Sequence, residues 1–110
     1  MTYTKDNPKL VDLFYSFEGI KTFTGVAKDK CNNIVYYLNG EIHREGRPAI
    51  EYADGDKAWF LNGNLHREDG PAIEKTDGGK RWWLNDKYYG CNNDFTNESW
   101  IRFVTLELLK

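Results

Sequence analysis

Short runs of alternating apolar and polar residues, separated by turn residues, follow one another from about residue 19 to residue 90. Such runs are typical of β-strands that bury one face. Asn-Gly pairs lie between apolar runs at 39–40 and 62–63, and an Asn-Asp pair lies at 85–86. Asn-Gly in this setting predicts a type I′ hairpin turn, because both central residues of that turn need positive φ. The pattern therefore predicts tight antiparallel hairpins.

Two further sets of turn residues divide the same region. Asp-Gly pairs at 54–55 and 77–78 predict one set, and the proline-ended segments 45–48 and 68–71 predict the other. Pro48 and Pro71 cannot donate to a strand ladder, so we expect them at strand starts or sheet edges. The expected strands are eight short segments: 35–38, 41–44, 49–52, 57–61, 64–67, 72–75, 80–84 and 87–89.

These elements recur with a period of 23 residues. Residues 37–59 and 60–82, called here the first and second units, are identical at 14 of 23 positions, and a third copy begins at Trp83. Residues 19–34 resemble a diverged copy. A period of this size is typical of repeat proteins, in which each unit buries its apolar face against a neighbour. The predicted fold class is mainly β with some α: an antiparallel β-meander of 23-residue hairpin repeats over about 19–90.

Helices are expected at both ends of this sheet. Thr96 is a suitable N-cap for a C-terminal helix over about 97–109, whose apolar stripe is unusually wide. We expect this helix to cap the repeats by lying across the sheet or closing its end. Asn7 as cap and Pro8 at the first position predict a short N-terminal helix with an apolar face up to Phe17. A strand through 13–17 is the alternative.

Composition limits the protein class. The 110 residues fit a single domain, 1–110, with one modest core, and 15% of them are aromatic. The formal net charge of −2 gives no global positive field, so a nucleic-acid partner is not expected. No apolar run approaches membrane-spanning length, and Cys31 and Cys91 are expected as reduced thiols, although a fold could pair them. These features predict a protein of the cytoplasm without membrane association.

The repeat also carries a resemblance. The segment over 59–72 reads Trp-Phe-Leu-Asn-Gly-x-Leu-His-Arg-x-Asp-Gly-Pro-Ala. It resembles the repeats of small phage and bacterial proteins, which are themselves similar to variants of the MORN repeat. The resemblance covers residues 25–90 and implies stacked β-hairpins in a curved single sheet with an interaction role. A phage origin would imply a host factor or a host-defence complex as the partner, met in the host cytoplasm.

Aromatic side chains are expected on both faces of the sheet. Two-residue turns would pair Tyr37 with Ile42, Phe60 with Leu65, and Trp83 with Tyr88 on one face. On the opposite face they would pair Tyr36 with His43, Trp59 with His66, and Trp82 with Tyr89. We call Tyr36, Trp59 and Trp82 the aromatic stripe. The stripe is either an exposed interaction surface or is covered by the helices and the sheet's curvature.

His-Arg-Glu occurs once in each unit, at 43–45 and 66–68. Neither histidine has a second ligand at metal spacing, and neither has a nucleophile and positioned partner, so no metal, cofactor or catalytic centre is expected. We expect each histidine to bond a turn carbonyl and each Arg-Glu pair to join neighbouring hairpins. Glu51 and Glu74 recur too, but are expected as solvated strand positions rather than a hydrolytic pair.

The sequence therefore predicts a non-enzymatic protein-interaction module. Aromatic and arginine side chains dominate many interfaces. The predicted binding residues are Tyr36, Trp59, Trp82, His43, His66, Arg44 and Arg67, whereas Trp100 is expected to anchor the C-terminal helix in the core. The alternative is a small-ligand, carbohydrate or nucleotide binder with a pocket lined by Trp59, Trp82, His43 and His66. The sequence leaves a homodimer open.

Overall fold

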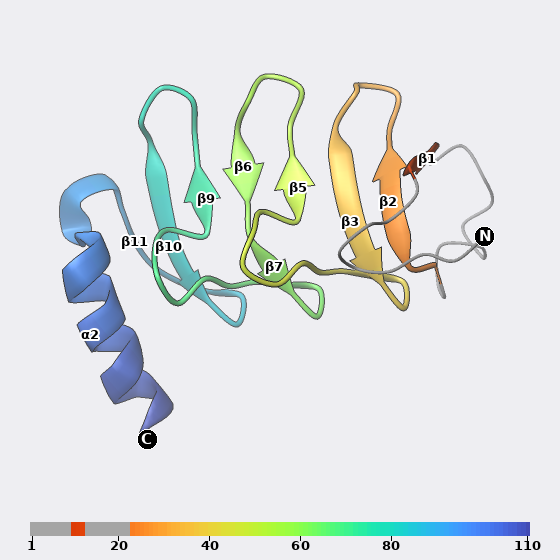
Figure 1. Cartoon of the computed structure of the whole chain (residues 1–110). Helices are drawn as coiled ribbons and strands as arrows, with labels where there is room; N and C mark the ends of the chain where they lie inside the picture. Colours follow the sequence, from red (N-terminus) through yellow and green to blue (C-terminus); the bar gives the residue numbers. More distant parts are fainter. Residues whose placement is uncertain (1–9, 13–22) are drawn as a thin grey trace.

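The computed structural model describes the backbone of residues 10–12 and the whole of residues 23–110. It is mainly antiparallel β with one C-terminal helix, as predicted (Figure 1). The elements are β1 (Leu10–Asp12), β2 (Gly25–Lys28), β3 (Ile34–Leu38), β4 (Glu41–Ile42), β5 (Ile50–Glu51), β6 (Lys57–Ala58), β7 (Phe60–Leu61), β8 (Asn64–Leu65), β9 (Ile73–Glu74), β10 (Lys80–Leu84), β11 (Lys87–Cys91), a short 3-10 helix η1 (Asn92–Asp94) and α2 (Asn97–Leu108).

The hairpin turns have the predicted geometry. Asn39 and Gly40 both have positive φ, 50° and 81°, and Asn62 and Gly63 repeat these values at 51° and 81°. Each pair joins two strands that hydrogen-bond to each other, β3 to β4 and β7 to β8. The predicted register is also observed, because Tyr37 lies opposite Ile42, Phe60 opposite Leu65, and Trp83 opposite Tyr88.

The strand order departs from a simple meander. The large sheet runs β1-β2-β3-β5-β6-β9-β10-β11, with β4 paired to β3 outside this path, while β7 and β8 form a separate two-stranded sheet. The first half of β3 pairs with β5 and its second half with β4. One long strand thus pairs with two short ones, because the loop between β4 and β5 returns the chain to the start of β3. The predicted strand 57–61 divides at Trp59 between the two sheets.

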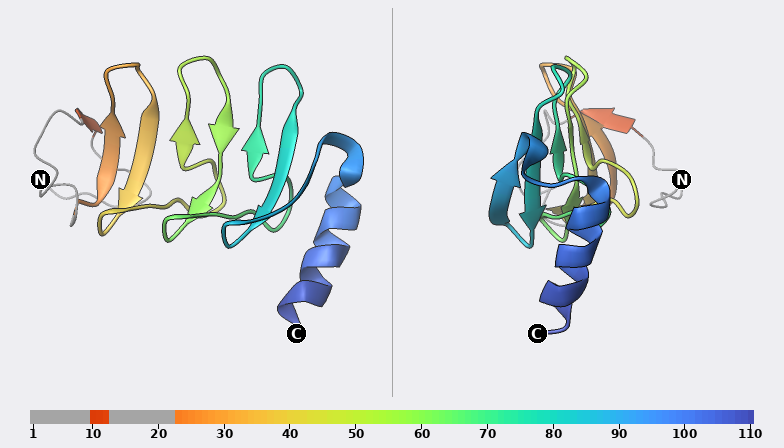
Figure 2. Two further views of the ribbon diagram at one scale, coloured as in Figure 1. Left: turned by 180° about the vertical axis from the view of Figure 1, so that it is seen from behind. Right: turned by 90° about the vertical axis from the view of Figure 1, so that its left-hand side faces the viewer.

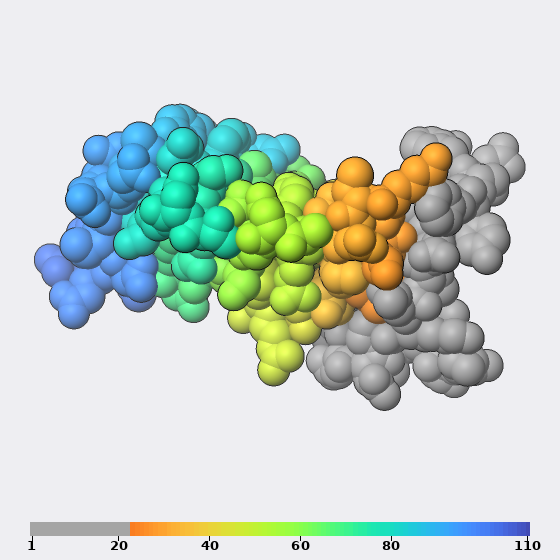
Figure 3. All heavy atoms as spheres, turned by 90° about the horizontal axis from the view of Figure 1, so that it is seen from above, coloured from red at the N-terminus to blue at the C-terminus, as the bar shows by residue number. Residues whose placement is uncertain are grey.

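The hairpins lie side by side in sequence order, and α2 stands at the end of the row (Figures 1 and 2). Viewed from above, the successive units also follow one another along the molecule (Figure 3). Because β11 is the last strand of the sheet, α2 packs at the end of the array. The predicted C-terminal helix 97–109 is observed over Asn97–Leu108, with Leu109 as the C-cap residue, and it stands at the end of the sheet, one of the two positions expected.

The N-terminal prediction is wrong where it can be compared. Leu10–Asp12 form β1, which pairs in parallel with β2, instead of a helix. The free edge of β2 provides the hydrogen-bonding partners that favour an extended chain there. The rest of the predicted helix, including Asn7, Pro8 and Phe17, lies outside the described residues.

Two groups of buried side chains form the hydrophobic core and join the two sheets and α2. Val35, Ile50 and Ala58 form one core between the large and small sheets, flanked by half-buried residues of the hairpins. The second core lies at the end of the array and joins the sheet to α2; its buried members are Trp82, Leu84, Trp100 and Val104. Trp100 has no exposed surface, which confirms its predicted role as the anchor of α2.

Candidate binding surfaces

The aromatic stripe is covered along its described length. Trp82 is fully buried and Trp59 is 9% exposed, so at these two positions the covered alternative holds. Neither indole offers the exposed surface that a role as a predicted binding residue would need. The Arg44 guanidinium lies 3.8 Å from the ring centre of Tyr36, and the Arg67 guanidinium lies 3.9 Å from that of Trp59. Stacked guanidinium groups thus cover the first two rings.

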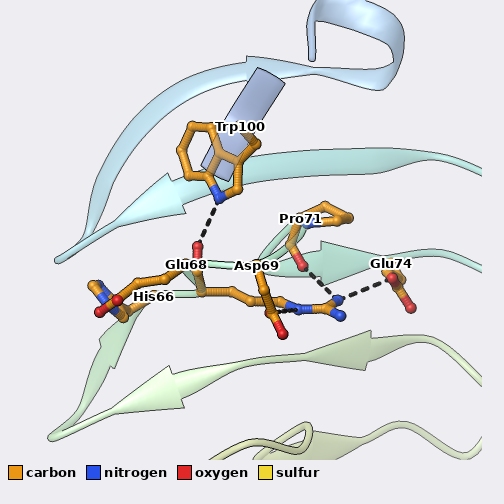
Figure 4. Close-up of polar contacts among 7 residues, drawn as sticks. His66, Glu68, Asp69, Pro71, Glu74 and Trp100 are labelled. Carbon is orange, nitrogen blue, oxygen red and sulfur yellow. Dashed lines mark hydrogen bonds and ion pairs between the residues drawn. The ribbon is translucent and has the colours of Figure 1, made fainter. Parts of the chain in front are cut away.

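The third ring of the stripe has a different cover. The position 23 residues after Arg67 is Gly90, which carries no side chain. Trp100 of α2 instead packs on Trp82, with ring centres 5.3 Å apart, and its Nε1 donates to the Arg67 carbonyl at 2.8 Å (Figure 4). The helix therefore takes the place that an arginine holds in each preceding copy, as expected of a terminal cap.

The register also changes at the third ring. Trp82 lies opposite Gly90 rather than Tyr89, because a β-bulge separates Trp82 from Trp83. The expected Trp82–Tyr89 pair is therefore wrong. The bulge turns Tyr89 towards α2, where its ring packs against Trp100 and Phe103 at centre distances of 5.8 and 5.0 Å. A bulge re-aims side chains in this way by adding one unpaired residue.

Each histidine joins its own unit to the next one. Nδ1 of His43 accepts a hydrogen bond from the backbone N–H of Asn62 at 2.9 Å, and Nδ1 of His66 accepts one from Asn85 at 3.1 Å. The predicted partner, a turn carbonyl, is wrong: the partner is the amide of the following Asn turn. Because Nδ1 is an acceptor, the neutral ring carries its proton on Nε2.

The two histidines differ at Nε2. Nε2 of His66 lies 2.8 Å from a carboxylate oxygen of Glu68, a hydrogen-bond distance. Nε2 of His43 lies 3.7 Å from Glu45 and has no hydrogen-bond partner, although the side chain is 93% buried. Both rings occupy equivalent positions, but only the second unit provides a carboxylate at hydrogen-bond distance.

The two arginines also differ in their partners, and again the residue of the second unit has the carboxylate contacts. Arg67 donates to Asp69 at 2.9 Å, to Glu74 at 3.0 Å and to the Pro71 carbonyl at 3.2 Å (Figure 4). These partners belong to its own unit, so the expectation that Arg-Glu pairs join neighbouring hairpins is wrong. The Arg44 guanidinium donates to the Pro48 carbonyl at 3.3 Å, and no carboxylate within the described part of the chain lies at ion-pair distance from it.

A pocket of about 290 Å³ lies where the two units meet. It contains four of the predicted binding residues but neither Trp82 nor His43, which the ligand hypothesis placed there. Its lining residues are Arg44, Gly46, Trp59, Leu61, His66, Arg67, Glu68 and Asp69. The pocket thus combines one apolar wall with two guanidinium groups and two carboxylates.

Glu51 and Glu74 do not form a pair. Lys57 lies between them in the sheet, opposite Glu51 on one side and Glu74 on the other. Glu74 is also bound to Arg67. These contacts give Glu74 a role in holding Arg67 over Trp59.

A further series of polar side chains joins the units at the opposite end of the hairpins. Asn33 Oδ1 accepts from the backbone N–H of Ala53 at 2.9 Å, and Asp56 Oδ1 accepts from Thr76 at 2.8 Å. Asn33 and Asp56 are 23 residues apart, and the next position is Gly79. The sequence analysis missed this series, although the polar residue at period 23 and its loss at the last copy are visible in the sequence.

These bonds also change the acidity of Asp56. The backbone N–H of Thr76 is the largest influence, and with the Lys75 ammonium, 3.2 Å away, it holds the pKa of Asp56 below its usual value of 3.8. At neutral pH Asp56 is therefore a charged acceptor.

The outward side of α2 is rich in exposed aliphatic side chains. Trp100 and Val104 face the core, whereas four large residues remain in solvent: Ile101 at 45%, Leu106 at 64%, Leu108 at 56% and Leu109 at 78% exposure. We call these four residues the α2 face. The sequence analysis noted the unusually wide apolar stripe of this helix but did not assign it to binding.

Other chemistry is limited within the described residues. Cys31 and Cys91 are free thiols. Among residues 23–110, no group of three or more His, Cys, Asp or Glu side chains is arranged to hold a metal ion. No described helix has the length and apolarity needed to cross a membrane.

Comparison of the chain with protein-family models, with curated proteins and with solved structures found no match.

Proposed function

We propose that this protein is a non-enzymatic protein-interaction module. The α2 face is the observation that carries the proposal: three large aliphatic side chains of the 12-residue helix and a fourth at its C-cap lie exposed at the end of the sheet. Apolar surface of this kind usually marks a docking site in a soluble protein. A helix offers such a surface to a complementary apolar groove.

The arrangement of the units supports the same function. We propose that the 23-residue units stack as hairpin repeats, with the bonds from His43, His66 and Asp56 joining each unit to the next. Repeat arrays of this kind present long surfaces to macromolecular partners. The resemblance to repeats of phage proteins adds a host factor or a host-defence complex, encountered in a bacterial cytoplasm, as the proposed target.

Affinity capture tests this function. Immobilised protein is exposed to a bacterial lysate, and the retained proteins are identified by mass spectrometry. The double variant Leu106→Gln/Leu109→Gln should retain about tenfold less partner, which corresponds to about 1.4 kcal/mol of binding free energy. Tyr52→Ser is the matched control, because Tyr52 is 39% exposed but lies outside α2.

Two results would contradict the proposal: a wild-type protein that retains no specific partner, or a double variant that retains it fully. Circular dichroism melts of each variant establish that the proteins compared are folded.

The pocket between the units supports a second candidate, a small-ligand binder. Trp59 and Leu61 offer an apolar wall, and Arg44 offers hydrogen-bond donors, a combination common in ligand sites. Its volume of about 290 Å³ lies at the lower end of the range for such sites. Titration with maltose and with adenosine monophosphate, followed through the indole N–H signal of Trp59 in NMR spectra, tests this candidate. An unchanged Trp59 signal would reject both ligand classes.

A further inference from the structure

The loops that follow β4 and β8 occupy the same position in the two units, but their basic residues have different acidic partners. In the second unit, Glu68 contacts His66 and Asp69 contacts Arg67, at 2.8 and 2.9 Å. In the first unit, Arg44 has no carboxylate partner among the described residues, and Nε2 of His43 is buried without a hydrogen bond. Both basic residues of the second loop thus have a carboxylate at hydrogen-bond distance. In the first loop, Glu45 lies 3.7 Å from Nε2 of His43, and Arg44 has no carboxylate partner among the described residues.

The difference at the arginines follows from one position in the sequence. Asp69 occupies the position two residues after Arg67, and Gly46 occupies the same position after Arg44. A side chain built at Gly46 would meet no atom within 4 Å. Gly46 also has a φ of 75°, a left-handed conformation that Asp69 does not adopt, so the two loops differ in backbone as well as in this side chain.

The Arg44 guanidinium is oriented by one stacking contact and one hydrogen bond. Its guanidinium stacks on Tyr36 at 3.8 Å and donates one hydrogen bond, to the Pro48 carbonyl. Stacking occupies the face of the group and leaves its in-plane N–H donors available, a geometry that suits bidentate binding of a carboxylate. Since the arginine is already oriented, less conformational entropy is lost on binding.

We propose that the first-unit loop is a docking site for an acidic side chain of a partner protein, whose carboxylate binds Arg44 as Asp69 binds Arg67. This inference rests on the proposed interaction function and names the chemistry of one contact. The contact lies on the repeat sheet and is separate from the α2 face.

The pocket composition favours a glutamate or aspartate over a phosphate group. Glu68 and Asp69 line the same pocket as Arg44, so a dianion would meet two negative charges at short range. A single carboxylate faces less repulsion and matches the single charge of the Arg44 guanidinium. Trp59 and Leu61 provide apolar surface for the methylene groups of the acidic side chain.

NMR spectroscopy of the arginine Nε–Hε groups tests the inference directly. The probe is the peptide N-acetyl-Gly-Glu-Gly-amide, and the matched control is the same peptide with glutamine. Titration with the glutamate peptide should shift the Arg44 signal in a saturable manner and leave the Arg67 signal in place. The glutamine peptide should shift neither. An Arg44 signal that does not move, or that moves equally with both peptides, would overturn the proposal.

A loop exchange provides the matched variant. Gly46→Asp/Arg47→Gly gives the first loop the Asp-Gly-Pro sequence of the second. Gly46 has a φ of 75° and Asp69 has no positive φ, so the exchanged loop should take the backbone of the second loop. Its own aspartate should then occupy Arg44 and weaken peptide binding at least about tenfold. Asp69→Gly should conversely make the Arg67 signal respond to the peptide. Unchanged peptide affinity in the loop-exchange variant would overturn the proposal. Acetate that binds as tightly as the peptide would also overturn it, by assigning the site to free carboxylic acids.

The two proposals can fail separately. A retained partner that depends on α2, together with an unresponsive Arg44, would reject only the docking site. A responsive Arg44 without any retained partner would reject the interaction function.

Discussion

The first and second units share most of their sequence and the same hairpin turn, yet they use their polar side chains differently. In the second unit, Arg67 is bound by two carboxylates and His66 by one. In the first unit, the equivalent residues Arg44 and His43 have no carboxylate at hydrogen-bond distance among the described residues. The Asn-Gly turns keep the same φ angles in both units, whereas the loop after the arginine differs: Gly46 has a φ of 75° and Asp69 has no positive φ. In both units the histidine accepts a hydrogen bond from the backbone N–H of the following Asn turn, and the units differ in the partners of their arginine.

The neighbours of the two units account for their different burial. The second unit packs against the end cap, where Trp100 covers Trp82, whereas the first unit ends at Trp59, beside the pocket. One unit has thus become part of the core at the end of the array, and the other keeps an open surface. The following predictions test this contrast, from the largest expected effect to the smallest.

The largest difference in the free energy of unfolding is expected between alanine variants of the two tryptophans that end the units. Trp82→Ala removes a fully buried ring that packs on Trp100 and Phe95, so it should lower the free energy of unfolding by about 3–5 kcal/mol. Trp59→Ala should cost less, about 2–3 kcal/mol, because its ring borders the pocket and the stack with Arg67. Urea unfolding followed by circular dichroism measures both. Equal losses would contradict the assignment of Trp82 to the end core.

The two histidines should both stabilise the array, and unequally. His43→Ala and His66→Ala each leave a turn amide without its acceptor, which should cost about 1–3 kcal/mol. His66→Ala also removes the contact with Glu68, so its loss should be larger by about 0.5–1.5 kcal/mol. Urea unfolding of the two variants provides the comparison. A larger loss at His43 would show that its Nε2 has a structural partner after all.

Replacing the arginine should also cost more free energy of unfolding in the second unit than in the first, with smaller losses than at the histidines. Arg67→Ala removes the cover of Trp59 and the contacts with Asp69 and Glu74, and should cost about 1–2 kcal/mol, since both acids are partly exposed. Arg44→Ala should cost about 0.5–1 kcal/mol, the usual range for an exposed cation–π contact. Thermal melts at low and high salt measure the difference. Salt should weaken the contribution of Arg67 more than that of Arg44.

Asp56 joins the first unit to the second through its bond to Thr76, and replacing it should change the thermal stability by a small amount that depends on pH. Its folded-state pKa lies below 3.8, so its charged form stabilises the fold above that pH, and this stabilisation is lost as the pH falls through the folded-state pKa. Asp56→Asn should keep the bond to Thr76, as Asn33 does with Ala53, but remove this part of the pH dependence. The variant should melt below the wild type at pH 7, and this difference should be smaller at pH 3.

The reverse substitution is the control for this prediction. Asn33→Asp should instead destabilise the preceding junction at neutral pH, because the new carboxylate would lie beside Asp29, which now accepts a hydrogen bond from Asn33 Nδ2 at 3.0 Å. If Asp56→Asn left the melting temperature unchanged at both pH values, the charge of Asp56 would have no part in joining the units.

Local signals in the sequence determined several features of this protein. The Asn-Gly pairs at 39–40 and 62–63 specify positive φ at two successive residues, so the turns and the cross-strand pairs next to them follow from the chain itself. The helix Asn97–Leu108 follows in the same way from its Thr96 cap and its apolar pattern. These elements depend on residues close together in the chain.

The tertiary structure decided which surfaces those elements cover. The pairing of β3 with β5, the bulge beside Trp82 and the burial of the aromatic stripe all depend on contacts between distant residues. Alternation places Trp59 and Trp82 on one face, but it cannot say whether an arginine, a helix or solvent lies over that face. The sequence also did not indicate that Arg44 has no carboxylate partner among the described residues. The two His-Arg-Glu motifs are identical in sequence and acquire different partners only when the chain is folded.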